Sequence, residues 1–270
     1  MEKYGYRFSF GPWNISEGVD PFGPPVRPAV AFDRKLEAYR RLGFDAVQLH
    51  DDDAVPDLDS KTAAQIREEA RALKGRLDAH GLVAEFVAPR LWENPLTIDG
   101  AFTSNDPAAR AYARERSHKT LDIVSELGID FVVVWFAREG TYLRESKDAV
   151  RAVDLLAAAL DDMLAYAPGV RIAVEPKPNE PMDISYIPTI GHAVALALRT
   201  AAPDRVGVLV ESAHAILAGL DPADEMAFGL AYNKLWSVHL NDQNGLKYDQ
   251  DRAFGSVNLR RAFDQVLVLD

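Results

Sequence analysis

Acidic side chains and histidines end several apolar runs in the second half of the chain. Glu175 ends the run RIAVE, Glu211 ends RVGVLVE, and His239 lies near the end of LWSVHL. Further residues of the same kind follow closely: His214, Asp249 and Asp251. Carboxylate oxygens with imidazole suit Mg²⁺, Mn²⁺ or Co²⁺. Because carboxylates gathered on one rim repel each other unless a cation compensates, the pattern predicts a metal site.

Each of these residues also has a plainer interpretation when it is taken alone. A single glutamate at a strand end is more often a helix cap or a member of a salt bridge. His50 alone is interpreted as a satisfied polar residue, and the run 51–53 (DDD) as a solvated turn. The metal site is favoured because such residues recur at the ends of successive strands.

The elements that must position these residues alternate regularly between strand and helix. The strand patterns, rich in Val, Ile and Phe, cover residues 7–11, 45–50, 83–88, 130–135, 171–175, 205–211 and 235–240. Helical patterns lie between them, at 33–42, 61–80, 107–127, 147–166 and 188–200. Strict alternation implies a parallel sheet. A (β/α)₈ TIM barrel needs roughly 250 residues and places its functional residues at the carboxyl ends of the strands, which fits this chain of 270 residues.

The eighth strand is missing or atypical in this pattern. After the run 235–240 comes a long loop, and residues 259–270 are interpreted best as a helix. An eighth strand would have to be the final VLVLD, residues 266–270. A doubly wound sheet is the structural alternative, but no GxGxxG follows the first strand. We therefore expect one (β/α) barrel domain over residues 1–270.

Composition excludes several function classes. The chain has 30 Lys and Arg against 41 Asp and Glu, a net charge of −11, which argues against nucleic acid and anionic membranes as partners. It has no cysteine, which excludes disulfides, thiolate nucleophiles and cysteine-based zinc sites. No secretory signal pattern and no apolar run of about 20 residues is found, so a cytoplasmic location is expected.

Several longer stretches carry a resemblance to a known family. They are VDPFGPPVRP (19–28), QLHDDD (48–53), DGAFTSND (99–106), VVWFAREG (133–140), VEPKPNEP (174–181), PTIGHA (188–193) and NDQNGLKYDQD (241–251). Through them nearly the whole chain resembles the xylose isomerases (glucose isomerases) of the actinobacterial type, as a truncated or divergent member. The resemblance implies interconversion of D-xylose and D-xylulose, and of D-glucose and D-fructose. The reaction would proceed by ring opening and a metal-assisted 1,2-hydride shift.

The resemblance also implies a role for each matching residue. Glu175 and Glu211 look like ligands of a first, structural metal, with Glu211 bridging to a second. The remaining ligands of that second, catalytic metal look like His214, Asp249 and Asp251. His50 and Asp53 look like the pair that assists ring opening, and Lys177 like the residue that polarises the carbonyl oxygen.

The aromatic residues of the family's pocket have counterparts as well. Trp13, Trp92 and Trp135 look like its apolar walls, although core packing is the plainer interpretation of each one alone. Phe22 looks like the aromatic that reaches into a neighbouring subunit's site, which implies a homodimer or homotetramer. The family's extended C-terminal arm is expected to be absent.

Two departures from the family pattern keep alternatives open. His239 stands where the family has an aspartate, and the next family ligand has no match unless Asp270 supplies it. We then expect the first metal site to have only three ligands, Glu175, Glu211 and His239. The protein could therefore bind either one cation or two. Phe136 and Ala137 stand where the family tends to have two glycines, which would narrow the pocket.

Two other functions remain open on this sequence. His239 brings the chain closer to the related ketose 3-epimerases, which hold one metal, so a one-metal sugar epimerase or isomerase is the first alternative. A non-catalytic homologue that binds sugar or metal is the second.

Overall fold

The computed structural model describes residues 5–15, 24–246 and 248–270. The chain divides into two compact units. The first contains residues up to 90 together with 119–131, and the second contains 91–118 and 132–270. The prediction of a single barrel domain stays a prediction.

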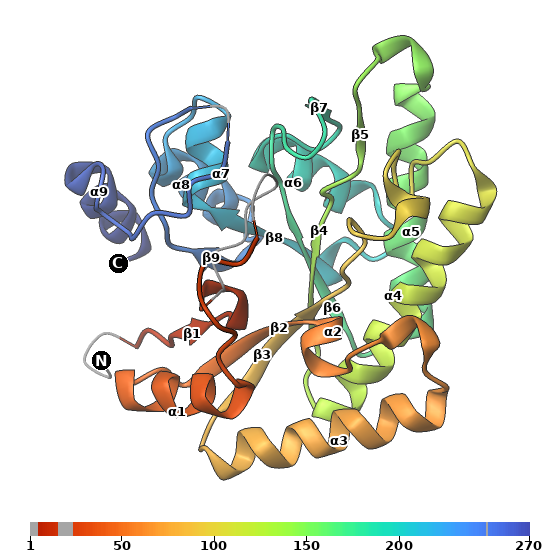
Figure 1. Cartoon of the computed structure of the whole chain (residues 1–270). Helices are drawn as coiled ribbons and strands as arrows, with labels where there is room; N and C mark the ends of the chain where they lie inside the picture. Colours follow the sequence, from red (N-terminus) through yellow and green to blue (C-terminus); the bar gives the residue numbers. More distant parts are fainter. Residues whose placement is uncertain (1–4, 16–23, 247) are drawn as a thin grey trace. The chain divides into compact units, whose positions relative to one another are not determined.

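The first unit consists of three parallel strands and their helices. The strands β1 (Ser9–Phe10), β2 (Ala46–His50) and β3 (Val83–Ala88) are neighbours in chain order, and His50 lies opposite Ala88 in the register. The helices of this unit are α1 (Phe32–Leu42), α2 (Asp51–Ala54) and α3 (Ala63–Ala79), with 3₁₀ turns η2 (Pro12–Asn14) and η3 (Leu58–Ser60). In Figure 1, α1 and α3 run along the same side of β2 and β3.

Local signals in the sequence explain where these helices begin and end. Thr62 and Gln65 form a reciprocal capping box at the start of α3, with the Thr62 N–H donating to Gln65 Oε1 at 2.9 Å. α1 ends at Gly43, whose φ of +86° is the left-handed conformation that glycine adopts without strain.

The second unit carries the later strands. Its parallel strands are neighbours in the order β4 (Phe131–Trp135, in this unit from Val132 on), β6 (Arg171–Glu175), β8 (Val206–Glu211) and β9 (Leu235–His239). A short antiparallel ladder joins β5 (Gly140–Thr141) to β7 (Ile184–Ser185). The helices are α5 (Ala149–Tyr166), α6 (Ile190–Arg199), α7 (Ser212–Leu217), α8 (Pro222–Ala231) and α9 (Leu259–Leu269), with 3₁₀ turns η4 (Pro95–Thr97), η5 (Arg144–Ser146) and η6 (Pro203–Arg205). α4 (Pro107–Leu127) belongs to this unit up to His118 and to the first unit beyond it.

The end of the chain is helical. Residues 266–270 continue α9 and its C-cap, so the predicted final helix is confirmed and the alternative of a strand there is wrong. The Asn258 side chain accepts a hydrogen bond from the Arg261 N–H (3.0 Å) and starts the helix. Among the described residues no parallel strand follows β9, so Asp270 does not occupy the end of an eighth strand. Figure 1 shows α9 beside α8.

Most predicted elements are confirmed with small differences at their ends. The first strand is shorter than predicted, because only Ser9 and Phe10 pair with β2. Sequence patterns missed the short elements α2, α7 and the β5–β7 ladder, and they also missed α8, which is as long as the predicted α6. In the described part of the chain, no helix combines the length and the apolar character needed to cross a membrane.

Candidate active site

Parallel strand pairing places the main acidic residues on one edge of the second unit. Glu175 is the last residue of β6, Glu211 the last of β8 and His239 the last of β9. Glu211 and His239 are partners in the β8–β9 register. His214 lies in the first turn of α7, which follows β8 directly. The strand ends therefore bring these four side chains together.

The distances confirm that they form one cluster. His214 Nε2 lies 3.2 Å from Glu211 Oε1, and its Nδ1 lies 3.5 Å from Glu175 Oε1. His239 Nδ1 lies 3.2 Å from Glu211 Oε2 and 3.8 Å from Glu175 Oε1. Glu175 and His214 are buried, and Glu211 is nearly so. Two imidazoles thus enclose a buried pair of carboxylates.

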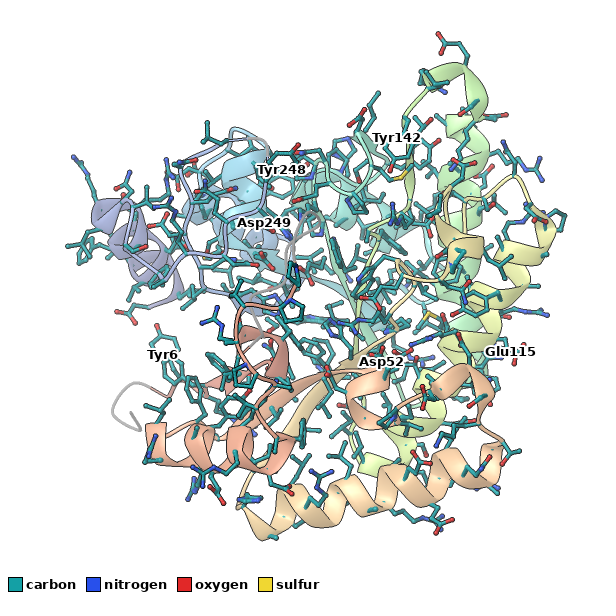
Figure 2. The ribbon with its side chains drawn as sticks, viewed as in Figure 1. Tyr6, Asp52, Glu115, Tyr142, Tyr248 and Asp249 are labelled. Carbon is teal, nitrogen blue, oxygen red and sulfur yellow. The ribbon has the colours of Figure 1, made fainter. Side chains whose placement is uncertain are left out.

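The loop after β9 adds two more carboxylates to this cluster. Figure 2 labels Asp249 on this loop, and its Oδ2 lies 3.1 Å from His214 Nε2. The amide of Asn241 donates to both Glu211 Oε1 and Asp251 Oδ1, each at 2.9 Å. Asn241 therefore connects the loop to the strand-end residues, although its role was not predicted.

Two groups of ligand atoms have the spacing of a metal site. Glu175, Glu211 and His214 offer atoms within 4.8 Å of one another, and so do Glu211, Asp249 and Asp251. Glu211 belongs to both groups. Oδ1 of Asp249 is buried and has no hydrogen-bond partner among the described residues. Oxygen donors with one imidazole fit a divalent cation of the Mg²⁺ to Co²⁺ class.

The pKa values show excess negative charge in the cluster. Burial, together with the charge of Glu211, raises the pKa of Glu175 to about 7. Burial and the charges of Glu211 and Asp249 raise the pKa of Asp251 to about 6. Burial also opposes ionisation of Glu211, but the imidazoles of His214 and His239 hold its pKa below the usual range. A cation bound here would relieve the repulsion that keeps protons on Glu175 and Asp251.

Lys177 lies beside this cluster and is held as an ammonium group. Its Nζ is 3.1 Å from Asp249 Oδ2 and 3.1 Å from Glu180 Oε2. Burial opposes the charge, but these two carboxylates raise the pKa of Lys177 above its ordinary value. Lys177 can therefore donate a hydrogen bond to a substrate oxygen and cannot act as a base near neutral pH.

Glu180 is a site residue that the sequence prediction missed. Besides its contact with Lys177, it accepts a hydrogen bond from the Asp249 N–H at 3.0 Å. It thereby connects the loop after β6 to the loop after β9. The signal was available, since Glu180 is the second glutamate of VEPKPNEP.

Aromatic rings accompany both groups of polar residues. In the second unit Trp92 and Trp135 pack edge to face with ring centroids 4.6 Å apart, and Lys177 Nζ lies 5.2 Å from the Trp135 centroid. In the first unit the Trp13 ring lies 4.3 Å from the His50 ring. Phe22 lies outside the described residues, so its role stays a prediction.

Phe136 takes part in buried packing rather than standing open to solvent. It and Phe102 are both buried, with ring centroids 6.3 Å apart and nearly perpendicular planes. The expected narrowing of the pocket by Phe136 and Ala137 stays a prediction.

In the first unit, His50 and Asp53 form the predicted pair. His50 Nδ1 lies 3.4 Å from Asp53 Oδ2, which also accepts a hydrogen bond from the His50 N–H at 2.9 Å. Burial opposes ionisation of Asp53, but His50 and the charge of Arg90 lower its pKa. A carboxylate that orients an imidazole is the arrangement of an acid–base pair.

The interpretation of residues 51–53 as a solvated turn is wrong for Asp51. This residue is fully buried in the first turn of α2. Its carboxylate accepts hydrogen bonds from the Arg90 N–H (3.2 Å) and the Thr120 hydroxyl (3.1 Å). Asp51 therefore fixes α2 to the end of β3 and to α4.

Comparison with known proteins decides the family. Residues 36–266 match the family model described as "Xylose isomerase-like TIM barrel". The chain belongs to this family. It is 40% identical over 274 residues to a xylose isomerase from Thermus thermophilus, a match that covers 99% of this chain and 70% of that protein. The TIM-barrel prediction is thus confirmed at the level of the family, while the actinobacterial type stays a prediction.

Solved structures with low sequence identity to this chain have the same fold. A D-tagatose 3-epimerase-like protein matches with a TM-score of 0.68 at 16% identity, over 98% of this chain and 87% of that one. The IOLI protein with a binding zinc atom matches with a TM-score of 0.66 at 17% identity, over 98% and 86% of the two chains. At these identities the two matches show that the fold is shared, and nothing more.

Proposed function

We propose that the protein is a divalent-metal-dependent aldose–ketose isomerase that interconverts D-xylose and D-xylulose, and also D-glucose and D-fructose. The observation that carries the proposal is the group Glu211, His214, Asp249 and Asp251 with the Lys177 ammonium beside it. Carboxylates and an imidazole without a thiolate select hard or borderline cations. The ammonium adds a proton donor for a sugar oxygen in the same unit.

The donor groups divide between two cation sites that share Glu211. Glu175, Glu211 and His239 would hold a first cation. Glu211, His214, Asp249 and Asp251 would hold a second. Bound cations supply electrostatic stabilisation of the charge that develops on two sugar oxygens during a hydride shift.

The chain's own residues supply the remaining steps. The imidazole of His50 moves a proton of the cyclic sugar and so opens the ring, while Asp53 orients it through Nδ1. Lys177 donates a hydrogen bond to the carbonyl oxygen of the open sugar. The rings of Trp92 and Trp135 exclude water, which favours hydride transfer over proton exchange with solvent.

His239 supports a second candidate function, a one-metal sugar epimerase. An imidazole in place of a carboxylate removes one negative charge from the first site and suits softer ions than Mg²⁺. With only Glu175, Glu211 and His239 as ligands, this site would hold a single ion. The reaction would then proceed by proton transfer, in which hydrogen of the sugar exchanges with water. For both candidate functions we propose a homodimer or homotetramer in the cytoplasm. Neither nucleic acid nor a membrane is proposed as a partner.

One experiment separates the candidates. The protein, freed of metal and then supplied with Mn²⁺ or Co²⁺, is incubated with D-xylose in D₂O, and the products are followed by NMR. Xylulose without solvent deuterium at C1 supports the isomerase. Deuterium in the product, or exchange of the configuration at C3 of a ketose, supports the epimerase.

Bound metal with no turnover of any aldose or ketose would overturn both candidates and favour a binding protein. Glu145→Gln is a matched control, because Glu145 is exposed and belongs to neither metal group. It should leave both metal binding and turnover unchanged.

A further inference from the structure

A groove with a volume of about 330 Å³ lies between α4 and α5. All the residues that line it belong to the second unit. Its volume is within the range of small-molecule binding sites, roughly 300–1,000 Å³. None of the residues that line it is a member of the two groups of metal-ligand atoms. The groove is therefore a separate candidate for a binding site.

Much of the lining of this groove is apolar. Phe102 and Met163 line it and are buried, and Leu155 lines it and is half-buried. Three further lining positions are alanines: Ala111, Ala158 and Ala159. Because an alanine side chain ends at Cβ, these positions leave space that longer side chains would fill. A ligand in the groove would therefore remove apolar surface from water, which favours binding.

Two arginines of α4 line the same groove. Arg110 and Arg114 lie one helical turn apart, so their side chains are on the same face of α4. Arg110 uses Nη1 to donate to the carbonyl oxygens of Ser104 and Asn105. Arg114 is exposed. In the part of the chain that the structure describes, no carboxylate forms an ion pair with either arginine. Both positive charges are therefore available to an anion.

The acidic residue of the lining, Asp162, limits the charge of that anion. Its Oδ2 lies 2.6 Å from His118 Nε2, so Asp162 already has a partner in the protein. Two guanidinium groups and one carboxylate leave the lining with one excess positive charge, although the whole chain carries −11. A ligand with a single negative charge balances this lining better than a dianion does.

We propose that the groove between α4 and α5 binds a small amphipathic carboxylate, a molecule with one carboxylate group and a short apolar chain. The carboxylate accepts hydrogen bonds from Arg114 and from the remaining nitrogens of Arg110, because a planar guanidinium group matches its two oxygens. The apolar chain covers Phe102, Leu155 and Met163. The proposal does not depend on the proposed function, since it involves neither a metal nor a sugar.

The first test titrates the metal-free protein with sodium octanoate in a calorimeter. We expect octanoate to bind at one site per chain. Each buried methylene group adds about fourfold to the affinity, so hexanoate should bind roughly tenfold more weakly. Octylammonium has a chain of the same length and the opposite charge, and it should not compete with octanoate. An absence of octanoate binding at millimolar concentration, or equal binding of octylammonium, would overturn the proposal.

The second test asks whether the charge of Arg114 holds the carboxylate. Arg114→Glu should weaken octanoate binding by about tenfold, because it replaces an attraction with a repulsion. Arg260→Glu makes the same change in net charge at an exposed position of α9 that does not line the groove. It should change the affinity by less than about twofold. Equal effects of the two substitutions would contradict the proposal. Arg114→Gln, with an expected loss of about threefold, takes the place of an Arg114→Glu that does not fold.

The third test fills the groove without changing its charge. Ala158 is exposed on α5, so Ala158→Phe should fold and should weaken octanoate binding by about tenfold. Ala227→Phe adds the same ring at an exposed position of α8, away from the lining residues, and should have no effect. If Ala158→Phe binds octanoate as tightly as the wild type does, octanoate binds elsewhere and the proposal is wrong.

A second copy of the chain is the other possible occupant of the groove. Size-exclusion chromatography of the same variants tests for it. A wild type that does not bind octanoate, together with an oligomeric state that changes in Arg114→Glu but not in Arg260→Glu, would assign the groove to a contact between subunits and overturn the proposal. Turnover of D-xylose with Mn²⁺ is measured separately, so failure of the isomerase would not be mistaken for failure of this site.

Discussion

The two acidic clusters of this molecule differ in how their charge is balanced. In the first unit, Asp51, Asp52 and Asp53 each have a partner supplied by the protein: a backbone N–H with a hydroxyl, a guanidinium, and an imidazole. In the second unit, carboxylates outnumber the neighbouring cations, and the pKa values of Glu175 and Asp251 rise to about 7 and about 6.

The difference indicates what each cluster is for. A cluster that the protein balances itself holds its side chains in one arrangement, as an acid–base pair requires. A cluster that keeps excess negative charge is completed by a cation from outside. The comparison therefore predicts that metal-directed changes will affect only the second cluster.

Glu211→Gln should have the largest effect, because Glu211 belongs to both groups of ligand atoms. Losing a residue that merely supports a metal ligand already lowers affinity roughly 10- to 100-fold, so Mn²⁺ affinity should fall by more than about 100-fold. Isothermal titration and metal analysis would measure it, with Glu145→Gln as the control. Unchanged binding of two equivalents would mean that Glu211 is not the shared ligand.

His50→Asn should give the next largest effect, and only on cyclic sugars. Losing a general acid–base group costs roughly 100-fold or more in turnover. The two clusters are balanced separately, so Mn²⁺ binding should not change. D-Glyceraldehyde cannot close a sugar ring, and its isomerisation should be nearly normal. An equal loss on glyceraldehyde and xylose would contradict the assignment of His50 to ring opening.

His239→Asp adds a carboxylate to the second cluster and so makes its excess of negative charge larger. The added carboxylate favours hard cations, so affinity for Mg²⁺ should rise relative to Mn²⁺ by about tenfold. Competition titrations would measure the ratio. A ratio that stays the same would exclude His239 from the metal's surroundings.

The smallest expected effect is a pH dependence of metal-induced stabilisation. Without metal, folded Glu175 (pKa about 7, ordinary value 4.5) and folded Asp251 (pKa about 6, ordinary value 3.8) hold protons that the unfolded chain has released. Their contribution to stability therefore falls as pH rises from about 4 to about 7. Metal displaces these protons, so the rise in Tm caused by Mn²⁺ should grow between about pH 5 and pH 7. The growth should be smaller in Glu175→Gln, and a flat profile in the wild type would contradict the charge account.

Much of the fold follows from sequence pattern where the pattern is long. The bounds of β3 and β6 were predicted because Val, Ile, Ala and Phe dominate both short runs, VAEFVA and RIAVE. Those of α4 were predicted because Pro107 and Gly128 mark its ends. Short elements were missed: four residues of α2, three of them aspartates, carry no helical period.

The candidate site was predicted less completely than the fold. Residues at strand ends could be assigned to one edge, since that follows from parallel pairing. The loop residues Asp249 and Asp251 were candidates from their type, and the resemblance to a known family assigned them to the second metal. Glu180, Asn241 and Arg90 were missed because their roles depend on how loops distant in sequence approach each other. No periodicity records such contacts.

Anomalous diffraction from crystals grown with Mn²⁺ would show directly whether a cation binds at Glu211. We predict a manganese peak bonded to the Glu211 carboxylate, with a second peak beside it if both ligand groups are filled, and no peak at Asp51, Asp52 or Asp53. Crystals saturated with Mn²⁺ that show no peak at Glu211 would contradict the account.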